Sequence, residues 1–309
     1  MRQNVMLPTA CAVDCHRPML STREKIAIAR VLNLAIVSAR RVAGRTPHVS
    51  VRRRQVRWVL DLNEGIDLAI YLGLYQRVPR RAVRWIALGA LVLDIGANIG
   101  AHSLPLAHAV GPDGRVIAIE PGDYAFARLK ANAAANPELM PQLVPIQAAL
   151  TADAAAPSNE ETVRFYSRWP LRGGGSDRHP KHLGAPETAV AARFLTLDTL
   201  LQELRHGNAI EQPVAFIKLD VDGHELDVLR GASHTLATEK PAILIEIAPH
   251  VQDEVPQRLD DLLGVLAAHG YRLEAPDSGE RLPMSAPALR ALIRDGASID
   301  ALARSDEGA

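Results

Sequence analysis

Four acidic residues close short apolar runs along the chain, an arrangement that can gather carboxylates at one edge of a parallel sheet. They are Asp94, Glu120, Asp220 and Glu246. Ligands of open α/β sheets bind beyond the carboxyl ends of the strands, so we expect these side chains around one ligand site. Carboxylates there can accept hydrogen bonds from hydroxyls, take a proton from an alcohol or hold a divalent cation.

The stretch from residue 91 to residue 120 predicts how the first two acids are positioned. We expect a buried strand over 91–95, a glycine turn over 96–100, a helix over 99–110 and a second strand over 116–119. A glycine turn lets a ligand approach the backbone closely. The helix N-terminus offers N–H groups and a partial positive charge that suit a carboxylate.

Glu120 is expected to bind a ribose. It stands at the end of the second strand, 24 residues beyond Gly96. Dinucleotide-binding folds place an acid at this point to accept hydrogen bonds from the ribose hydroxyls. We therefore predict an adenosine-containing ligand.

The spacing of the glycines favours one such ligand. The order is Asp94, Gly96, Asn98, Gly100, without the third glycine of G-x-G-x-x-G that a pyrophosphate needs. The D-x-G-x-N-x-G form resembles the first motif of S-adenosylmethionine-dependent methyltransferases. We predict S-adenosyl-L-methionine, bound by these four residues and Glu120. A nicotinamide or other nucleotide, or a turn with only a structural role, remains an alternative.

Composition excludes several other classes. Lys plus Arg and Asp plus Glu each number 35 among 309 residues, so no overall charge attracts nucleic acid or an acidic membrane. Three tryptophans give no stacking platform for bases. No integral membrane segment and no secretion signal is evident, and the only cysteines, Cys11 and Cys15, are expected to be incidental thiols of a cytoplasmic protein.

Strand and helix patterns alternate through the centre of the chain, with one helix expected over 223–236. This alternation predicts an α/β fold, a doubly wound and mostly parallel sheet with helices on both faces. We divide the chain into a partly disordered extension with a basic helix (1–55), the main domain (56–278) and a helical C-terminal tail (279–309). The helix expected over 22–42 packs against its own domain in our preferred interpretation, with a membrane surface or a partner as the alternatives.

A second stretch, 215–247, carries a resemblance to a known family. It contains Lys218, Leu219, Asp220, Val221, Asp222, Gly223, His224 and Glu225, followed by Gly231 and Ala232. With DLNEGIDLAIYLGLYQ (61–76), GANIG (96–100), IEP (119–121) and LTLDTLL (195–201), it resembles the FkbM family of methyltransferases over roughly residues 58–275. Two departures are Asp222, where the family commonly has Glu, and Gln76, also commonly Glu.

The resemblance implies a class I methyltransferase-like Rossmann fold and an S-adenosylmethionine-dependent O-methyltransferase. Its substrate would be a small-molecule or carbohydrate acceptor, with the hydroxyl on a sugar, glycan or secondary metabolite. The alternatives are a nicotinamide-linked oxidoreductase and a nonenzymatic nucleotide-binding module. A homo-oligomer is left open.

Asp220 is the first candidate for the catalytic base, or for a ligand of a cation that acidifies the hydroxyl, and His224 is the second. Asp222 and Glu225 satisfy a capping box, so Asp222 is expected mainly to cap a helix. Together with Glu246, the two aspartates offer oxygen ligands that suit Mg²⁺ rather than zinc, although the spacing does not establish a metal. Lys218 is expected to be an edge charge.

The segment from Arg172 to His182 is rich in glycine and polar residues. It suits either a mobile lid over a polar acceptor or a disordered surface insertion. As a lid, it would offer Arg172, Ser176, Arg178 and His179 as hydrogen-bond donors.

Overall fold

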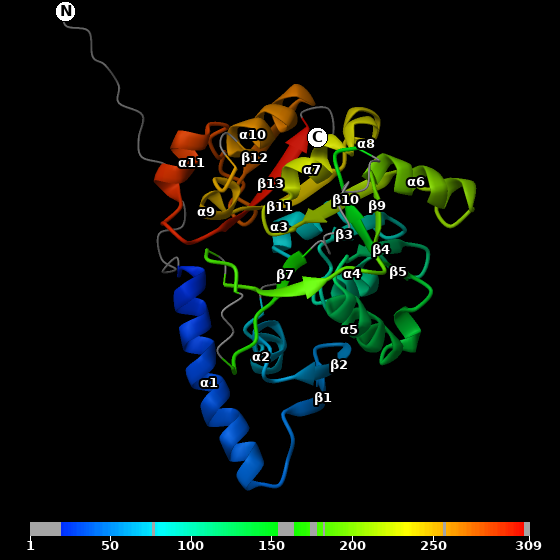
Figure 1. Ribbon diagram of the computed structural model, residues 1–309. Coiled ribbons are helices and arrows are strands. Elements are labelled where there is room, and N and C mark those ends of the chain that lie inside the picture. The colour runs from blue at the N-terminus through cyan, green and yellow to red at the C-terminus, as the bar shows by residue number, and fades with distance from the viewer. Residues whose placement is uncertain are drawn as a thin grey trace, which may run out of the picture.

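A seven-stranded sheet runs through the centre of the computed structural model (Figure 1). The structure describes residues 20–75, 78–153, 164–173, 178–181, 183–255 and 258–305. In sheet order, the strands are β12 (Tyr271–Glu274), β13 (Ile299–Ser305), β11 (Ala242–Ile247), β10 (Val214–Leu219), β3 (Leu91–Ile95), β4 (Arg115–Ile119) and β5 (Leu143–Ile146). Only β13 runs antiparallel to its neighbours.

Helices cover both faces of this sheet. One face packs against α3 (Arg80–Val83), α4 (Ser103–Ala109) and α5 (Asp123–Ala134). The other packs against α6 (Leu197–His206), α7 (Glu225–Arg230), α8 (Ser233–Thr238), α10 (Arg258–Ala268) and α11 (Ala286–Leu292). Two short helices, η1 (Pro137–Leu139) and α9 (Pro249–Gln252), complete these layers.

The apolar runs of the central strands follow from this double cover. In β3, Leu91, Leu93 and Ile95 face one helical layer and Val92 faces the other. Both faces of the strand are therefore buried and mostly apolar, with Asp94 as the exception, and the alternation of a half-exposed strand is absent. The predicted doubly wound, mostly parallel α/β fold is confirmed.

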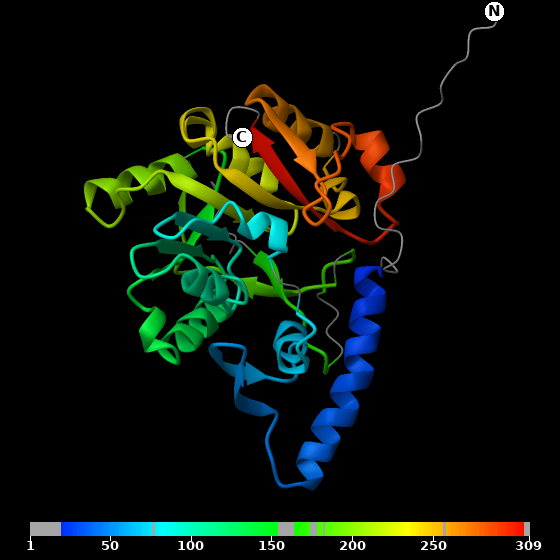
Figure 2. The ribbon, with the colours of Figure 1, turned by 180° about the vertical axis from the view of Figure 1, so that it is seen from behind.

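The N-terminal segments pack beside the sheet rather than in it (Figure 2). They comprise α1 (Thr22–Val42), the hairpin of β1 (His48–Arg53) and β2 (Val56–Asp61), and α2 (Gly65–Leu72). Asn33 of α1 is 1% exposed, and its Nδ2 donates to the carbonyl oxygen of Leu62 at 2.7 Å. Helix α1 thus packs against its own domain. No described helix combines the length and hydropathy needed to cross a membrane.

A small β insertion lies between β5 and α6. It contains β6 (Ala148–Leu150) paired with β9 (Arg193–Leu195), and β7 (Arg164–Arg168) paired with β8 (Ala185–Thr188). The hairpin is joined to the start of α2, since Arg168 lies 2.5 Å from Glu64 and the N–H of Gly65 donates to the carbonyl of Trp169.

The described part of the expected lid is bonded to the rest of the protein. The Nε of Arg172 donates to Asn33 Oδ1 at 3.0 Å, and His179 Nε2 lies 3.1 Å from Glu254 Oε2. Arg178 donates to the carbonyl of Pro170. Ser176 and His182 lie outside the described residues, as do Cys11, Cys15 and Gln76.

The C-terminal segment differs from the sequence prediction. The helical tail expected over 279–309 contains α11, but residues 299–305 form β13, which lies between β11 and β12 in the sheet. Leu302 is completely buried there. The short run at 299–305 was missed because its partners are distant in sequence. The 55/56 boundary also falls within the β1–β2 hairpin.

Two helices begin or end at other residues than expected. The helix expected over 99–110 begins at Ser103, because Asn98 and Gly100 both take positive φ and extend the turn. The helix expected over 223–236 is two helices, α7 and α8, separated at Gly231.

Replacing Leu302 by alanine should lower the free energy of unfolding by about 2–5 kcal/mol, because it leaves a cavity in the sheet core. The matched variant Leu88→Ala, at an 81% exposed position, should change it by less than about 0.5 kcal/mol. Urea unfolding of both variants measures the difference. Equal effects would show that β13 does not occupy the sheet in solution.

Candidate active site

A cavity of about 390 Å³ lies beyond the carboxyl ends of β3, β4 and β10. Its polar lining includes Asn98, Glu120 and Asp220. Its apolar lining comes from the strand ends and from the β insertion, and includes Ile119, Pro121, Leu150, Phe165, Trp169 and Phe194. We refer to it as the first cavity. Its mixed lining suits a ligand that has both a flat apolar part and hydroxyl groups.

Glu120 lies at the floor of the first cavity and is only 2% exposed. Its Oε2 accepts the backbone N–H of Asn98 at 2.8 Å, and its Oε1 accepts that of Gly122 at 2.9 Å. Burial raises the pKa of Glu120 to about 7, although these two hydrogen bonds oppose the shift. Each carboxylate oxygen keeps acceptor capacity, so the side chain can still accept hydroxyl donors.

A buried acid that the sequence interpretation missed stands near Glu120. Glu187 of β8 accepts the N–H of Ala125, in the first turn of α5, at 2.6 Å and the hydroxyl of Ser167 at 2.8 Å. Its negative charge also contributes to the raised pKa of Glu120. The insertion hairpin is thereby fixed to the sheet edge beside the first cavity.

The glycine turn brings β3 and β10 into close contact. Gly96 has φ +80°, and a Cβ at this position would lie 1.8 Å from the carbonyl oxygen of Asp220. Only glycine allows this approach, which sets Asp220 beside the turn.

The backbone N–H groups of residues 96–98 in the turn are bonded within the protein. Gly96 and Ala97 both donate to the carbonyl of Ile119 at 3.0 Å, and Asn98 donates to Glu120. The side chain of Asn98 donates to the carbonyl of Ser167 at 2.7 Å.

Two of the predicted cofactor residues, Asp94 and Gly100, do not line the first cavity. Asp94 is fully buried and accepts the hydroxyl of Ser103 at 2.5 Å. A Cβ on Gly100 would lie 2.8 Å from Leu129 Cδ1, so this glycine permits packing against α5. Gly96, Asn98 and Glu120 do line it.

Lys218 is a buried charge at the centre of the site, not the expected edge charge. It is 5% exposed, and its Nζ lies 3.0 Å from Asp220 Oδ2 and 3.8 Å from Asp94 Oδ1. Burial lowers the pKa of Lys218, but the two carboxylates outweigh burial and raise it. Burial likewise opposes ionisation of Asp220, but Lys218 outweighs it and lowers the pKa of that carboxyl. Asp220 is therefore held in its ionised form.

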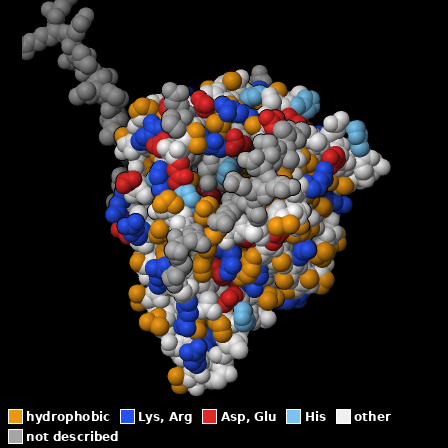
Figure 3. Space-filling model, viewed as in Figure 1, with side chains coloured by type: hydrophobic (Ala, Val, Ile, Leu, Met, Phe, Trp, Pro, Cys, Tyr) orange, Lys and Arg blue, Asp and Glu red, His pale blue; other side chains and the backbone are white. Residues whose placement is uncertain are grey.

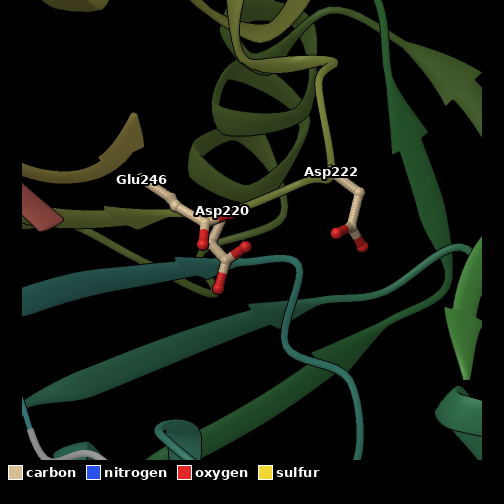
Figure 4. Close-up of side chains that lie close together, drawn as sticks. All are labelled: Asp220, Asp222 and Glu246. Carbon is tan, nitrogen blue, oxygen red and sulfur yellow. The ribbon is translucent and has the colours of Figure 1, made fainter. Parts of the chain in front are cut away.

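Three carboxylates meet at the ends of β10 and β11 (Figure 4). Asp220, Asp222 and Glu246 each offer an oxygen within 4.8 Å of the others. Burial, followed by the charge of Asp220, raises the pKa of both Asp222 and Glu246. Oxygen donors at this spacing could hold Mg²⁺, although Lys218 already compensates one negative charge.

The capping box predicted at residues 222–225 is wrong. Helix α7 begins at Glu225, and the residue before it, His224, makes no side-chain cap bond. Asp222 has φ +50°, and the carboxylate of Glu225 accepts the N–H groups of Val221 and Gly223 instead. Asp222 is therefore left to face the first cavity.

His224 also lines the first cavity, with a side chain that is 58% exposed. Its Nδ1 lies 3.5 Å from Asp227 Oδ2, and its ring centroid lies 6.1 Å from that of Phe165. The structure thus brings both predicted catalytic residues to the same cavity, from positions on either side of the turn at Asp222.

Tyr75 and His102 are further site residues that the sequence interpretation missed. Their ring centroids are 5.2 Å apart, and both line the first cavity and a neighbouring cavity of about 450 Å³, which we call the second cavity. Little in the sequence indicated either residue. Tyr75 follows the end of α2, outside any predicted glycine or strand-end motif, and His102 lies in a segment predicted to be helix.

The chain is similar to known methyltransferases and to one curated synthetase. The sequence model of the methyltransferase FkbM domain matches residues 94–273, more than half of the chain. The AMB antimetabolite synthetase AmbE of Pseudomonas aeruginosa is 28% identical over 213 residues, covering 60% of this chain and 10% of AmbE. The chain therefore spans about a tenth of the length of this curated relative.

Two solved structures are also similar. The methyltransferase FkbM from Methylobacillus flagellatus has a TM-score of 0.41 and 18% identity, covering 71% of this chain and 44% of that one. TYW2 from M. jannaschii, in complex with AdoMet, has a TM-score of 0.40 and 14% identity, covering 85% of this chain and 88% of that one.

Replacing Lys218 by methionine should lower the free energy of unfolding by about 3–5 kcal/mol, because Asp94 and Asp220 lose their cation. The deficit should shrink as the pH falls from about 8 to about 5, since protonation removes the unpaired charges. Urea unfolding at several pH values measures both effects. In the control, Lys130→Met at an exposed position, stability should change by less than about 1 kcal/mol. A pH-independent deficit would contradict the electrostatic role of Lys218.

Proposed function

The chain belongs to the FkbM methyltransferase family, and from this premise we propose that it is an S-adenosylmethionine-dependent O-methyltransferase. The observation that carries the proposal is the buried carboxylate of Glu120 at the floor of the first cavity, at the end of β4. An acid at this position can accept the ribose hydroxyls of a nucleoside. Phe165, Phe194 and Pro121 offer apolar surface for its base.

The residues around Glu120 fit this cofactor and disfavour a dinucleotide. S-adenosylmethionine, when bound, supplies a methyl group already activated on a sulfonium. The turn lacks the third glycine of the pyrophosphate motif, and its amides at Gly96, Ala97 and Asn98 are bonded within the protein. These features argue against the nicotinamide-linked alternative.

Asp220 is the proposed acceptor of the hydroxyl proton. Methyl transfer to oxygen depends chiefly on holding the acceptor in line with the donor, with help from a base when the acceptor is an unactivated alcohol. Lys218 keeps Asp220 ionised, so its carboxylate is available to accept a hydrogen bond from the alcohol. His224, on the same cavity, is the second candidate.

The acceptor is proposed to be a hydroxyl of a sugar, glycan or secondary metabolite. The relative AmbE is an antimetabolite synthetase, which supports the last of these. Nucleic acid is not an expected substrate, and a cytoplasmic location and possible homo-oligomer stay predictions.

Glu120→Gln should weaken the binding of S-adenosylhomocysteine by about 1–3 kcal/mol, roughly 5- to 150-fold, because the charge-assisted hydrogen bonds are lost. Glu211→Gln, at an exposed position, is the matched control. Wild-type affinity should fall from pH 8 to pH 6, as Glu120 protonates near its raised pKa of about 7, whereas the variant should show no such dependence. Calorimetric titration measures both. Unchanged affinity in the variant would refute the ribose contact.

Asp220→Asn should leave S-adenosylhomocysteine affinity within about threefold and lower methyl transfer by about 10²–10⁴-fold. The assay follows release of S-adenosylhomocysteine with any alcohol that the wild type methylates. Full turnover in the variant would remove Asp220 from the mechanism. A nonenzymatic module would bind S-adenosylhomocysteine and methylate no acceptor.

Magnesium at Asp220, Asp222 and Glu246 is tested in the same assays. If Mg²⁺ assists the reaction, chelation should lower turnover of the wild type, and Glu246→Gln should remove that sensitivity. Turnover that is unaffected by chelation would exclude a metal role.

A further inference from the structure

The second cavity, of about 450 Å³, lies between α1, α2 and the ends of three strands. Two of its walls are mostly apolar. Helix α1 contributes Ile28, Ala29 and Leu32 together with the charged Lys25, and helix α2 contributes Leu68, Ala69 and Leu72. A cavity of this size accommodates a molecule of about drug size, and its walls favour an apolar body.

The floor of the second cavity is charged. Lys218 and Asp220 come from β10 and its end, Glu246 from β11 and Asp300 from β13. Glu246 and Asp300 are register partners, so their side chains project from the same face of the sheet. Burial raises the pKa of Asp300 to about 6, with the charge of Asp220 adding to the shift. Grouped carboxyl groups on a floor beneath apolar walls suit a ligand with a hydroxylated end.

The two cavities meet at four shared residues. Tyr75, His102, Lys218 and Asp220 line both. A molecule in the second cavity would therefore lie against Asp220, which also lines the first cavity, where we place the cofactor. This shared lining links the second cavity to the proposed reaction.

Helix α1 is a fixed wall of this cavity. Its capping box joins Ser21 and Glu24, and Glu24 lies 3.0 Å from Arg294. The N–H of Thr22 donates to the carbonyl of Gly296, and Asn33 bonds to Leu62 and Arg172. The outward face of the helix, along the lower left of Figure 3, mixes hydrophobic and basic side chains.

We propose that the second cavity binds the acceptor, and that the acceptor is an alcohol with an extended apolar body, which packs between α1 and α2 while its hydroxylated end reaches Asp220. This inference rests on the proposed function and adds the substrate class. Helix α1 lies outside the segment that matches the family, residues 94–273, so this wall is a specificity element supplied by the N-terminal part of the chain.

The test uses n-hexyl and n-octyl β-D-glucoside and free glucose, titrated below micelle-forming concentrations into protein saturated with S-adenosylhomocysteine. Each buried methylene contributes about 0.8 kcal/mol, or roughly a fourfold gain in affinity. Octyl glucoside should therefore bind up to about 15-fold more tightly than hexyl glucoside, and glucose most weakly. Equal affinities for the three compounds, or no binding by any of them, would overturn the proposal.

Two matched pairs of variants locate the binding. Ala29→Trp fills the cavity and should weaken octyl glucoside at least tenfold, whereas Ala27→Trp, at an exposed position on the same helix, should not. Ile28→Asn removes apolar wall from a position that is already 49% exposed, so it should fold, and should reduce the gain from hexyl to octyl. Val31→Asn, 70% exposed and away from the cavity, is its control.

Each outcome separates the two proposals. All four variants should bind S-adenosylhomocysteine as the wild type does, when titrated without glucoside. If both members of each pair behave alike toward octyl glucoside, the acceptor cavity is refuted while the cofactor assignment stands. If no S-adenosylhomocysteine binds, the proposed function fails, and the same glucoside titrations of the unliganded protein still test the cavity.

Discussion

The buried ammonium of Lys218 is the interaction on which the rest of the site depends. It lies between Asp94, inside the sheet, and Asp220, at the end of β10. Without this cation, the fully buried carboxylate of Asp94 would have no compensating charge beside Asp220, and burial would favour its neutral form. With it, Asp220 stays ionised at the point where the two cavities meet.

The backbone geometry around this ion pair is equally restrictive. Gly96 allows the turn after β3 to pass within contact distance of the Asp220 carbonyl. The Nζ of Lys218 also lies 3.4 Å from the carbonyl oxygen of Gly96, so charge and turn are fixed together. Asn98 bonds the glycine turn to Ser167 of the β insertion, and Glu187 of the insertion bonds to the first turn of α5. The first cavity is therefore enclosed by elements from distant parts of the chain.

The second cavity is enclosed by elements added to the central part of the sheet. Strand β13 brings Asp300 beside Glu246, and α1 and α2 supply apolar walls above this charged floor. The helices that form these walls, α1 and α2, precede the glycine turn at residues 96–100 in the chain. A division follows, in which the central strands carry the charged groups and the N-terminal helices supply the apolar walls of the second cavity.

The sequence by itself determined the central strands, the glycine turn and the acids at the strand ends, because apolar runs and glycine spacing are local signals. It also indicated the family through linked motifs around Asp220. Only the tertiary structure decided that Lys218 is buried and that Asp94 and Gly100 lie outside the lining of the first cavity. It also decided that β13 enters the sheet and that Tyr75 and His102 line both cavities. These features arise from contacts between residues far apart in the chain, and neither periodicity nor spacing along one segment records which distant side chain fills the adjoining space.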